Sequence, residues 1–314
     1  MESFLASQSL HQQNNNQHII HYNSCPVCSS KNISHVLTAK DHTVSKENFE
    51  VWHCNHCTLR FTQNIPDIHN IGPYYQSIAY VSHSDTQEGL INKLYHIVRN
   101  YTLQSKRKLV QSATELATGS LLDVGAGTGA SASIMQTAGW NVTGLEPDDT
   151  ARKNALEKHQ LQLQSPDNLY QLPANQFDAI TMWHVLEHVH DLQGYMDTYH
   201  RILKQNGKLV IAVPNYTSYD AAAYQENWAA YDVPRHLYHF SPKSIDELAK
   251  LKGFTVQQYQ PMWFDSFYVA MLSEQCKTGK NNLIAAVWNG LISNLKTLFD
   301  KKKCSSVIYV LTKA

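Results

Sequence analysis

Blocks of apolar residues alternate with amphipathic stretches from residue 119 to residue 314. The short apolar runs have the length of buried strands, and between them apolar residues recur at spacings of three and four, as on one face of a helix. The expected strands are 121–124, 142–145, 161–164, 177–182, 208–213, 254–259 and 306–311. The expected helices are about 129–138, from 148, about 191–203, from 242 and about 282–299. This alternation is typical of a parallel sheet with helical layers, so we predict an α/β domain over 119–314.

Polar residues mark several ends of these helices. Asp148 and Ser241 are good N-cap residues, and Pro242 suits the first helical position. Asn206-Gly207 is expected to end the helix that begins near 191, before the strand at 208–213.

The first 118 residues have a different pattern. Residues 1–23 are polar and rich in Gln and Asn, so we expect a mobile tail. Residues 24–64 contain three short strand patterns, and residues 65–118 become helical from about 86 to 116. The apolar face expected on this helix is formed by Leu90, Leu94, Ile97, Val98 and Tyr101. The segment 65–118 is interpreted either as a bridging linker or as a lid that carries Tyr75, Tyr80 and His83.

Four of the six cysteines form two C-x-x-C pairs, Cys25/Cys28 and Cys54/Cys57. In a chain without an evident export signal, such pairs favour metal over disulfides. Four thiolates at this spacing predict a closed, structural zinc site in a ribbon over 24–64.

The overall charge places limits on partners. Lys plus Arg and Asp plus Glu both number 26 among 314 residues, so the formal net charge is zero. This balance gives no support for a nucleic-acid or membrane footprint. No apolar run approaches the roughly 18 residues of a membrane span, and no basic stretch followed by an apolar run begins the chain. We therefore expect a cytoplasmic protein without a membrane partner, and the charge balance disfavours a nucleic-acid partner.

A glycine-rich turn follows the first strand of the α/β domain. Gly125, Gly127 and Gly129 come directly after 121–124 and before a helix of small residues. A strand, a glycine turn and a helix build a ligand site at the carboxyl end of a parallel strand. The second strand ends in Glu146, an acid suited to a ribose diol, so the ligand is expected to be nucleotide-like.

Asp123 discriminates between two such ligands. A dinucleotide would place its pyrophosphate at the helix N-terminus, close to this carboxylate, and the like charges would repel. S-adenosylmethionine has no phosphate and carries a sulfonium and an α-ammonium. Asp123 therefore favours S-adenosylmethionine over NAD.

Several segments in order resemble the class I S-adenosylmethionine-dependent methyltransferases. Two further segments recur in their subgroup of ubiquinone-biosynthesis-like O-methyltransferases. The segments for the family are Leu122–Gly129, Gly144–Pro147, Phe177–Val189 and Arg201–Val210, and those for the subgroup are Val213–Asn215 and Asp232–Ser241. The resemblance covers about 119–260 and implies a Rossmann-like, seven-stranded, doubly wound sheet whose last strand is antiparallel.

The resemblance also implies roles for individual residues. Asp123 and the turn backbone would line the methionine portion, Glu146 would bind both ribose hydroxyls, and Pro147 would pack near adenine. Asp167 or Asn168 would meet the adenine amino group, and Met182 to His184 would flank the cofactor and face the acceptor. The residues expected at the cofactor are Asp123, Gly125, Ala126, Gly127, Glu146, Pro147, Asp167 and Trp183.

Histidines supply the candidates for proton transfer. His184, His236 and His239 lie at expected sheet edges or loops, and a neutral imidazole can accept a proton near neutral pH. His184, Glu187 and His188 share a helical-turn spacing that can also bind a divalent metal. Relatives with a metal at this position read E-x-x-E-H, whereas His184 stands here in place of the first acid.

The sequence thus predicts methyl transfer from S-adenosylmethionine to an acceptor, with a hydroxyl of a small molecule implied by the subgroup resemblance. Three alternatives stay open: an rRNA methyltransferase, a sugar C-methyltransferase and a non-enzymatic docking module built on the zinc ribbon. The ribbon is not basic, which disfavours RNA, and the intact Asp123 and Glu146 disfavour a non-enzymatic role.

Overall fold

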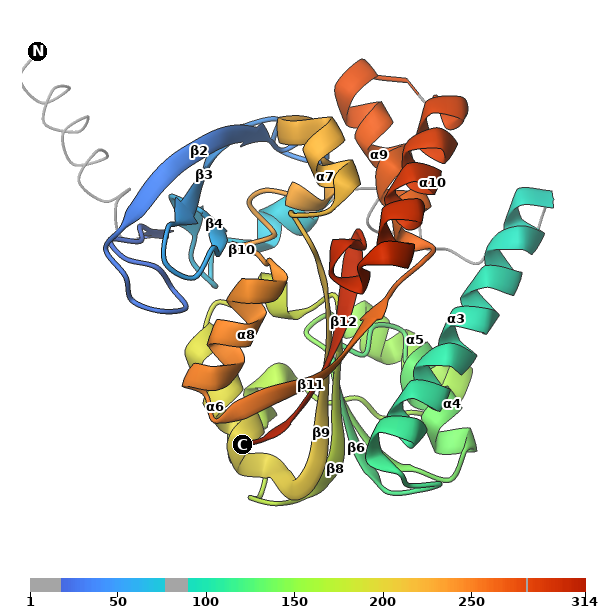
Figure 1. The fold of residues 1–314 in the computed structure, drawn as a ribbon. Coiled ribbons are helices and arrows are strands. Elements are labelled where there is room, and N and C mark those ends of the chain that lie inside the picture. Colours follow the sequence, from blue (N-terminus) through green and yellow to red (C-terminus); the bar gives the residue numbers. More distant parts are fainter. Residues whose placement is uncertain (1–17, 77–89, 281) are drawn as a thin grey trace, which may run out of the picture.

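The centre of the computed structural model, which describes residues 18–76, 90–280 and 282–314, is a six-stranded sheet (Figure 1). Its strand order is β11-β12-β9-β8-β6-β7. The strands are β6 (Ser120–Val124), β7 (Asn141–Leu145), β8 (Phe177–Trp183), β9 (Leu203–Pro214), β11 (Phe254–Pro261) and β12 (Ser306–Lys313). Strands β6 to β9 pair in parallel, whereas β12 is antiparallel to both of its neighbours. The predicted α/β class and antiparallel last strand are confirmed.

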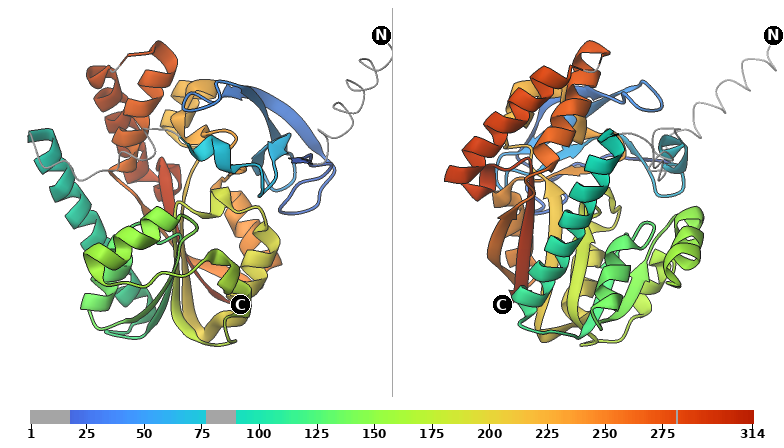
Figure 2. Two further views of the ribbon diagram at one scale, coloured as in Figure 1. Left: turned by 180° about the vertical axis from the view of Figure 1, so that it is seen from behind. Right: turned by 90° about the vertical axis from the view of Figure 1, so that its right-hand side faces the viewer.

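Helices cover both faces of this sheet (Figures 1 and 2). One face carries α3 (Leu90–Thr114), α4 (Ala130–Thr137) and α5 (Asp149–His159), and the other carries α6 (Leu192–Ile202) and α8 (Pro242–Leu251). The expected caps are present. The Asp148 side chain accepts a hydrogen bond from the amide of Ala151, and Ser241 forms a capping box with Ser244. These caps satisfy amides that have no partner within the first helical turn.

The cysteine-rich segment forms a second sheet with the order β10-β4-β3-β2. Its strands are β2 (Ile33–Lys40), β3 (Asn48–Cys54), β4 (Arg60–Thr62) and β10 (Tyr238–His239), and beside it β1 (Ile19–Ile20) pairs with β5 (Ile65–Pro66). Strand β10 comes from the loop after β9, and Tyr238 lies opposite Phe61 of β4. One buried apolar cluster contains residues of both sheets. The cysteine-rich segment is therefore continuous with the α/β domain in both hydrogen bonding and core packing.

A helical hairpin lies above the carboxyl ends of the parallel strands (Figure 1). It connects β11 to β12 and consists of α9 (Asp265–Thr278) and α10 (Leu283–Phe299), followed by η7 (Lys301–Lys303). α7 (Tyr219–Tyr224) and the short turns η5 (Gln225–Asn227) and η6 (Ala229–Tyr231) pack near this hairpin. The pattern predicted α10 but not α9, in which a continuous apolar run, 267–272, is followed by a mostly polar stretch, so that no helical face stands out.

Two differences from the expected sheet have local causes. The seventh strand, expected at 161–164, contributes only a single bridge between Gln164 and Leu145, because Ser165 and Pro166 begin the turn η3 (Pro166–Gln171). The helix expected to end at Asn206-Gly207 ends at Ile202 instead, and Asn206 and Gly207 lie inside β9. A shift in the pairing of β8 with β9 accommodates these extra residues.

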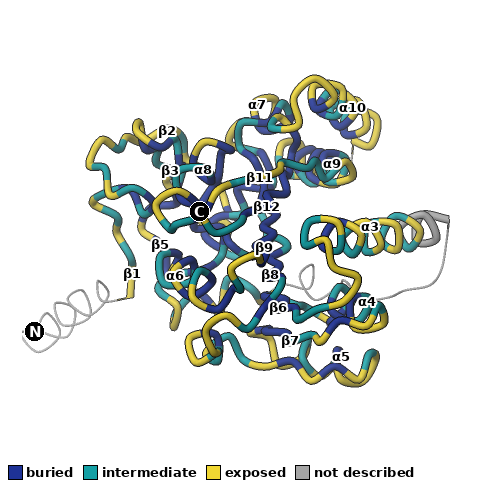
Figure 3. The backbone as a smooth tube through the Cα atoms, turned by 60° about the horizontal axis from the view of Figure 1, so that its bottom comes forward, coloured by how far each residue is buried: buried dark blue, intermediate teal, exposed yellow. Residues whose placement is uncertain are grey.

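The residues of α3 that are buried against the sheet also differ from those predicted to form its apolar face. Ile97 and Tyr101 are 66% and 64% exposed, whereas Leu109 and Val110, more than two turns further along the helix, are buried against the sheet. The side chains of Leu90 and Leu94 lie outside the described residues, as do Tyr80 and His83 of the expected lid. Figure 3 shows the core concentrated around the central sheet, with an exposed surface along much of α3.

Candidate functional site

The glycine turn connects β6 to α4 in a conformation that few other residues adopt. The φ angles of Gly125, Gly127 and Gly129 are +67°, +55° and +81°. A side chain at Gly125 would collide with Val185, whose Cγ2 lies 2.4 Å from the position of a Cβ atom. No heavy atom lies within 4 Å of the same position at Gly127. The backbone at Gly127 is therefore accessible to the close approach of a ligand.

Asp123, at the carboxyl end of β6, provides a buried carboxylate beside this turn. The residue is 1% exposed, and its Oδ1 accepts a hydrogen bond of 2.6 Å from Thr181 Oγ1. Its Oδ2 is buried without a hydrogen-bond partner among the described residues. Burial raises the pKa of Asp123 to about 6. A buried oxygen with an unused acceptor position suits a cationic ligand, as S-adenosylmethionine requires.

Glu146 lies directly after β7 and faces the same turn. Its Oε2 accepts a hydrogen bond of 2.7 Å from the amide of Gly127, and its Oε1 accepts one of 3.0 Å from the amide of Asp148. Burial raises the pKa of Glu146, and the two amides oppose that rise. The carboxylate expected to bind ribose thus lies against the glycine turn.

The two residues expected near adenine lie at the outer edge of the sheet. The Glu146 amide donates a hydrogen bond of 2.9 Å to the carbonyl of Gln164, which brings η3 beside β7. Pro147 and Asp167 are both exposed there, and Asp167 accepts a hydrogen bond from the Ser165 hydroxyl. The structure therefore brings Asp123, Glu146 and the turn together, and it leaves Pro147 and Asp167 at their rim.

Trp183 ends β8 and lies against α3. The Lys106 ammonium lies 4.3 Å from the centre of the indole ring, a cation–π contact. Burial lowers the pKa of Lys106, and the charges of Asp123 and Asp265 oppose this effect. The indole Nε1 is buried without a hydrogen-bond partner among the described residues.

His184 follows Trp183 with a positive φ of 58° and lies between two carboxylates. Its Nδ1 is 3.5 Å from Glu187 Oε1, and its Nε2 is 3.0 Å from Asp265 Oδ2. Burial alone would lower the pKa of His184, but contacts with Asp265 and Glu187 raise it to about 10. In this arrangement the imidazole keeps its proton at neutral pH, which disfavours His184 as the group that accepts one.

Three side chains meet at the loop that follows β9, to which His236 belongs: Glu187, His188 and His236. We call this group the Glu187 cluster. Each offers a ligand atom, and these atoms all lie within 4.8 Å of one another. Glu187 is 0% exposed, and neither of its carboxylate oxygens has a hydrogen-bond partner among the described residues. The two imidazole rings are 4.5 Å apart between their centres.

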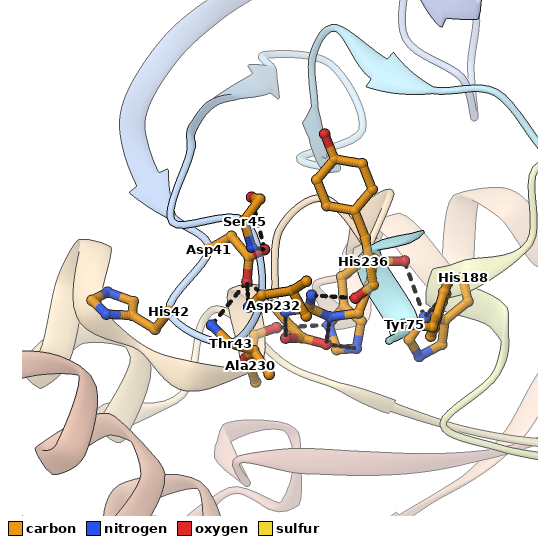
Figure 4. A network of polar contacts seen from close by, with 12 residues as sticks. Asp41, His42, Thr43, Ser45, Tyr75, His188, Ala230, Asp232 and His236 are labelled. Carbon is orange, nitrogen blue, oxygen red and sulfur yellow. Dashed lines mark hydrogen bonds and ion pairs between the residues drawn. The ribbon is translucent and has the colours of Figure 1, made fainter. Parts of the chain in front are cut away.

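The backbone fixes the tautomers of both histidines in the Glu187 cluster (Figure 4). His188 Nδ1 lies 3.0 Å from the carbonyl of Arg235, and His236 Nδ1 lies 2.8 Å from the carbonyl of Ala230. A carbonyl only accepts, so each Nδ1 carries a hydrogen, and in the neutral form of each ring the lone pair is on Nε2. Burial lowers the pKa of His188 to about 4, which keeps this ring neutral.

The Glu187 cluster fits a divalent cation better than the trio expected from sequence spacing. Two imidazoles and one carboxylate are ligands of Zn²⁺ and Fe²⁺, and the carbonyls behind the rings orient them as in metal centres. Three protein ligands leave coordination positions open, as in catalytic sites. His236 takes the third place here, whereas His184 is paired with Asp265.

His239 lies apart from the cofactor edge, on β10. It is 3% exposed, and its Nε2 lies 3.1 Å from Thr62 Oγ1 of the cysteine-rich segment. Burial lowers the pKa of His239 well below its usual value, so the ring is neutral. This contact lies within the second sheet, where β10 pairs with β4.

Arg235 connects the same two parts of the molecule through buried ion pairs. It is 0% exposed and donates to Asp232 and, at 3.0 Å, to Asp41 in the loop after β2. Its Nη1 donates to the carbonyl of Tyr74 at 2.8 Å, and the adjacent Tyr75 hydroxyl lies 3.1 Å from His188 Nδ1. Asp41 and Asp232 both accept hydrogen bonds from the Arg235 guanidinium, and Figure 4 shows both carboxylates in the same polar network as His188 and His236.

The four cysteines of the two C-x-x-C pairs converge on one point. Cys25 and Cys57 have sulfur atoms 3.4 Å apart, and those of Cys28 and Cys54 are 3.6 Å apart. All four sulfurs lie within 4.8 Å of one another. Tetrahedral zinc with bonds of about 2.3 Å requires sulfur atoms about 3.8 Å apart, so the cysteine cluster fits this ion.

Sequence analysis missed three residues of this region: Lys106, Asp265 and Asp41. Lys106 and Asp265 flank Trp183 and His184 from α3 and α9, and Asp41 pairs with Arg235. None belongs to a motif. A polar residue early in α9 gave no signal, because α9 itself was not predicted.

Comparisons with known proteins agree with this geometry. Residues 96–259, slightly more than half of the chain, match the model of a family described as a methyltransferase domain. The demethylmenaquinone methyltransferase of Tropheryma whipplei (strain Twist) is 28% identical over 166 residues, which cover 50% of this chain and 64% of that protein. The mitochondrial ubiquinone biosynthesis O-methyltransferase of Homo sapiens is 28% identical over 163 residues, covering 47% and 44%. The chain thus matches less than two thirds of the length of these relatives.

Solved structures show the same fold. The magnesium protoporphyrin IX methyltransferase of Synechocystis PCC 6803 with bound SAH has a TM-score of 0.51 and 13% identity, covering 77% of this chain and 97% of that one. Together, the glycine turn, the buried Asp123 and the match over 96–259 identify the family. The chain belongs to the class I S-adenosylmethionine-dependent methyltransferases.

Proposed function

We propose that this chain transfers the methyl group of S-adenosylmethionine to a hydroxyl of a small molecule. The observation that carries the proposal is the buried Asp123 carboxylate, whose Oδ2 has no hydrogen-bond partner among the described residues and which lies beside the open backbone of Gly127. The curated relatives include O-methyltransferases of ubiquinone biosynthesis, which supports oxygen as the acceptor atom.

The chain would act mainly by positioning. S-adenosylmethionine supplies an already activated methyl group, so the remaining requirement is an in-line arrangement of acceptor, methyl and sulfur. Asp123 would hold the cationic part of the donor, and Glu146 would hold the ribose once it exchanges its amide contacts for hydroxyl donors. Trp183 and His184, at the carboxyl end of β8, would face the acceptor.

Proton removal is assigned to the Glu187 cluster. The Nε2 lone pair of His236 is the best placed of the three candidates, because His184 is held protonated and His239 contacts the cysteine-rich segment. A divalent cation held by Glu187, His188 and His236 would occupy the same Nε2 lone pair, so it is the alternative to His236 as base: it would lower the pKa of an acceptor hydroxyl instead. Zinc held by the cysteine cluster would have a structural role, since four thiolates leave no open position.

The alternatives differ in their acceptor. An rRNA or sugar acceptor would use the same donor site, and a docking module would not require one.

A search of the helices in the described part of the chain found none with the length and apolar character of a membrane span.

Calorimetry with S-adenosylmethionine, S-adenosylhomocysteine and NAD tests the donor site. We expect both adenosyl ligands to bind, NAD not to bind, and Asp123→Asn to weaken S-adenosylmethionine binding by about tenfold or more. Binding of NAD alone would overturn the proposal. Labelled S-adenosylmethionine with fractionated metabolites and RNA would then identify the acceptor class.

A further inference from the structure

Helix α10 exposes its large apolar side chains and buries its small ones, whereas an ordinary surface helix does the reverse. Its buried positions carry small residues, namely Ala286, Gly290, Ser293 and Thr297. Its exposed positions carry large apolar residues, namely Leu283, Ile284, Val287, Trp288, Leu291, Leu295, Leu298 and Phe299. Ile284 is 86% exposed and Phe299 is 92% exposed. A surface helix of a globular protein normally turns its apolar stripe toward the core.

Specific contacts fix this orientation. Ser293 Oγ donates a hydrogen bond of 2.8 Å to the buried Asp220, and Asn289 Nδ2 donates one of 3.0 Å to the Tyr224 hydroxyl. A Cβ atom at Gly290 would lie 2.6 Å from the ring of Phe267 in α9. The apolar face therefore cannot turn inward without the loss of buried hydrogen bonds and close packing.

The apolar surface continues toward the proposed acceptor site. Trp263 and Phe264, just before α9, are 38% and 42% exposed. The ring of Phe264 lies 6.0 Å from that of Tyr101 in α3, which is 64% exposed. The next residue after Phe264 is Asp265, the partner of His184. Exposed aromatic residues therefore also occur at the start of α9, next to the residue that contacts His184.

The charged residues next to α10 in the sequence are mostly lysines, of which Lys302 also lies 4.0 Å from Asp246. No acidic residue occurs between Leu283 and Phe299, and only Asp300 follows directly. Lysines lie at both ends of the helix: Lys277 and Lys280 before it, and Lys296, Lys301, Lys302 and Lys303 in its last turn and after it. The zero net charge of the whole chain conceals this local asymmetry.

We infer that the exposed face of α10 docks on the surface of an anionic lipid bilayer. An amphipathic helix with Trp, Leu and Phe on one face and basic flanks lies in the plane of the membrane, with its apolar side chains at the headgroup boundary. Contacts with α9 and α7 hold α10 against the rest of the chain, so it lies on the membrane and does not span it. Docking would bring the mouth of the acceptor site to the lipid surface.

A second copy of this chain fits the same face less well. A two-fold interface along α10 would place one lysine-rich end beside another in either relative direction of the helices, and these charges would repel. Anionic headgroups complement lysines at both ends. The inference rests on this surface and does not depend on the proposed methyl transfer.

Vesicle flotation of the full chain tests the inference. We expect the chain to float with vesicles of phosphatidylglycerol and phosphatidylcholine, to bind phosphatidylcholine alone more weakly, and to be released in part by high salt. The double variant Ile284→Asp/Trp288→Asp should lower the fraction bound by about tenfold or more, because it places two charges in the apolar face. Leu156→Asp, at a 52% exposed leucine on α5, is the matched control and should bind as the parent does.

Circular dichroism and S-adenosylmethionine calorimetry show whether each variant is folded and keeps its donor site. A parent chain that does not float, or a double variant that floats equally well, would overturn the inference. The parent could instead fail to bind vesicles and sediment as a dimer, while the double variant is monomeric. That result would assign the exposed face of α10 to contact with a second copy of the chain. Failure of these tests is distinguishable from failure of the proposed function, which is read from donor binding and turnover.

Discussion

The cysteine cluster and the Glu187 cluster are two groups of metal-capable ligands with opposite designs. The cysteine cluster has four thiols from two local pairs, with sulfur atoms close to the spacing of tetrahedral zinc. The Glu187 cluster has three ligands of two kinds, and His236 comes from a loop remote from Glu187 in sequence. A closed set of ligands serves structure, whereas an open set leaves room for an acceptor.

The surroundings of the cysteine cluster are apolar, whereas those of the Glu187 cluster are polar. Cys25, Cys54 and Cys57 belong to the buried apolar cluster that also contains the core of the α/β sheet. The Glu187 cluster is surrounded by polar groups: the carbonyls of Arg235 and Ala230, the Tyr75 hydroxyl and Asp232. Loss of the first should therefore affect stability, and loss of the second should affect chemistry.

The largest expected effect is the loss of the cysteine cluster. Cys54→Ser removes a fully buried thiol from the proposed zinc site, and structural zinc contributes on the order of 10 kcal/mol to small domains. Because this cluster shares its core with the α/β domain, we expect the whole chain to unfold at much lower temperature or to become insoluble. Zinc content by mass spectrometry and thermal unfolding measure the effect.

Cys304→Ser is the matched control, since Cys304 is equally buried but lies outside the cluster. It should retain zinc. Equal stability of the Cys54→Ser variant and the parent would show that the cluster does not support the fold.

The Glu187 cluster provides the next test. Glu187→Gln removes the buried carboxylate, so we expect turnover to fall roughly 10²-fold or more while S-adenosylmethionine affinity stays unchanged. Stability should fall by only about 1–3 kcal/mol, because His184 keeps its contact with Asp265. Steady-state kinetics with added Zn²⁺, Mn²⁺ or Fe²⁺, together with calorimetry for the donor, separate the two effects.

Glu274→Gln is the control for Glu187→Gln. Glu274 is 6% exposed and accepts a hydrogen bond from Tyr224, far from any proposed ligand. It should show a comparable loss of stability with normal turnover. If both variants lost turnover in proportion to stability, the Glu187 cluster would have no specific role.

The two histidines after β9 sharpen the assignment of the base. His236→Ala should lower kcat by about 10- to 100-fold, because it removes the free Nε2 lone pair. His239→Ala should act mainly on stability, since His239 bridges to Thr62 of the cysteine-rich segment. Parallel measurement of kcat and unfolding temperature compares them, and unchanged rates for both would refute the assignment.

The sequence predicted features that depend on neighbouring residues. Asp123, the glycine turn, Glu146 and the cysteine pairs are contiguous motifs, and their geometry follows from one strand end or one tight turn. Asp148 and Ser241 cap their helices as expected, because capping is decided within one turn. The strand expected at 161–164 is reduced to one bridge by the adjacent Pro166, a local effect that the apolar pattern did not include.

Features that depend on tertiary packing escaped prediction. The partner of His184 is Asp265, on a helix that the pattern did not indicate. Strand β10 joins the sheet of the cysteine-rich segment across a long stretch of sequence, and hydrophobic periodicity carries no information about such pairing. The sequence pattern did not predict that the apolar face of α10 is exposed. Periodicity shows that a helix has an apolar face, but it does not show whether that face is buried or points to solvent.

Asp123 lies outside both clusters. The pH dependence of S-adenosylmethionine affinity that its ionisation causes is the smallest effect expected. With a pKa of about 6, Asp123 is almost fully ionised at pH 7.5 and about one quarter ionised at pH 5.5, so S-adenosylmethionine affinity should fall about fourfold over this range. Because the folded-state pKa is raised, ionisation costs stability as pH rises toward 6, and Asp123→Asn should stabilise the ligand-free chain at pH 7.5 by about 2 kcal/mol. Calorimetry and thermal unfolding across this pH range measure both effects. An Asp123→Asn variant that bound the donor weakly at all pH values yet unfolded at higher temperature would place Asp123 in function rather than in folding, the role we propose for the Glu187 cluster and not for the cysteine cluster.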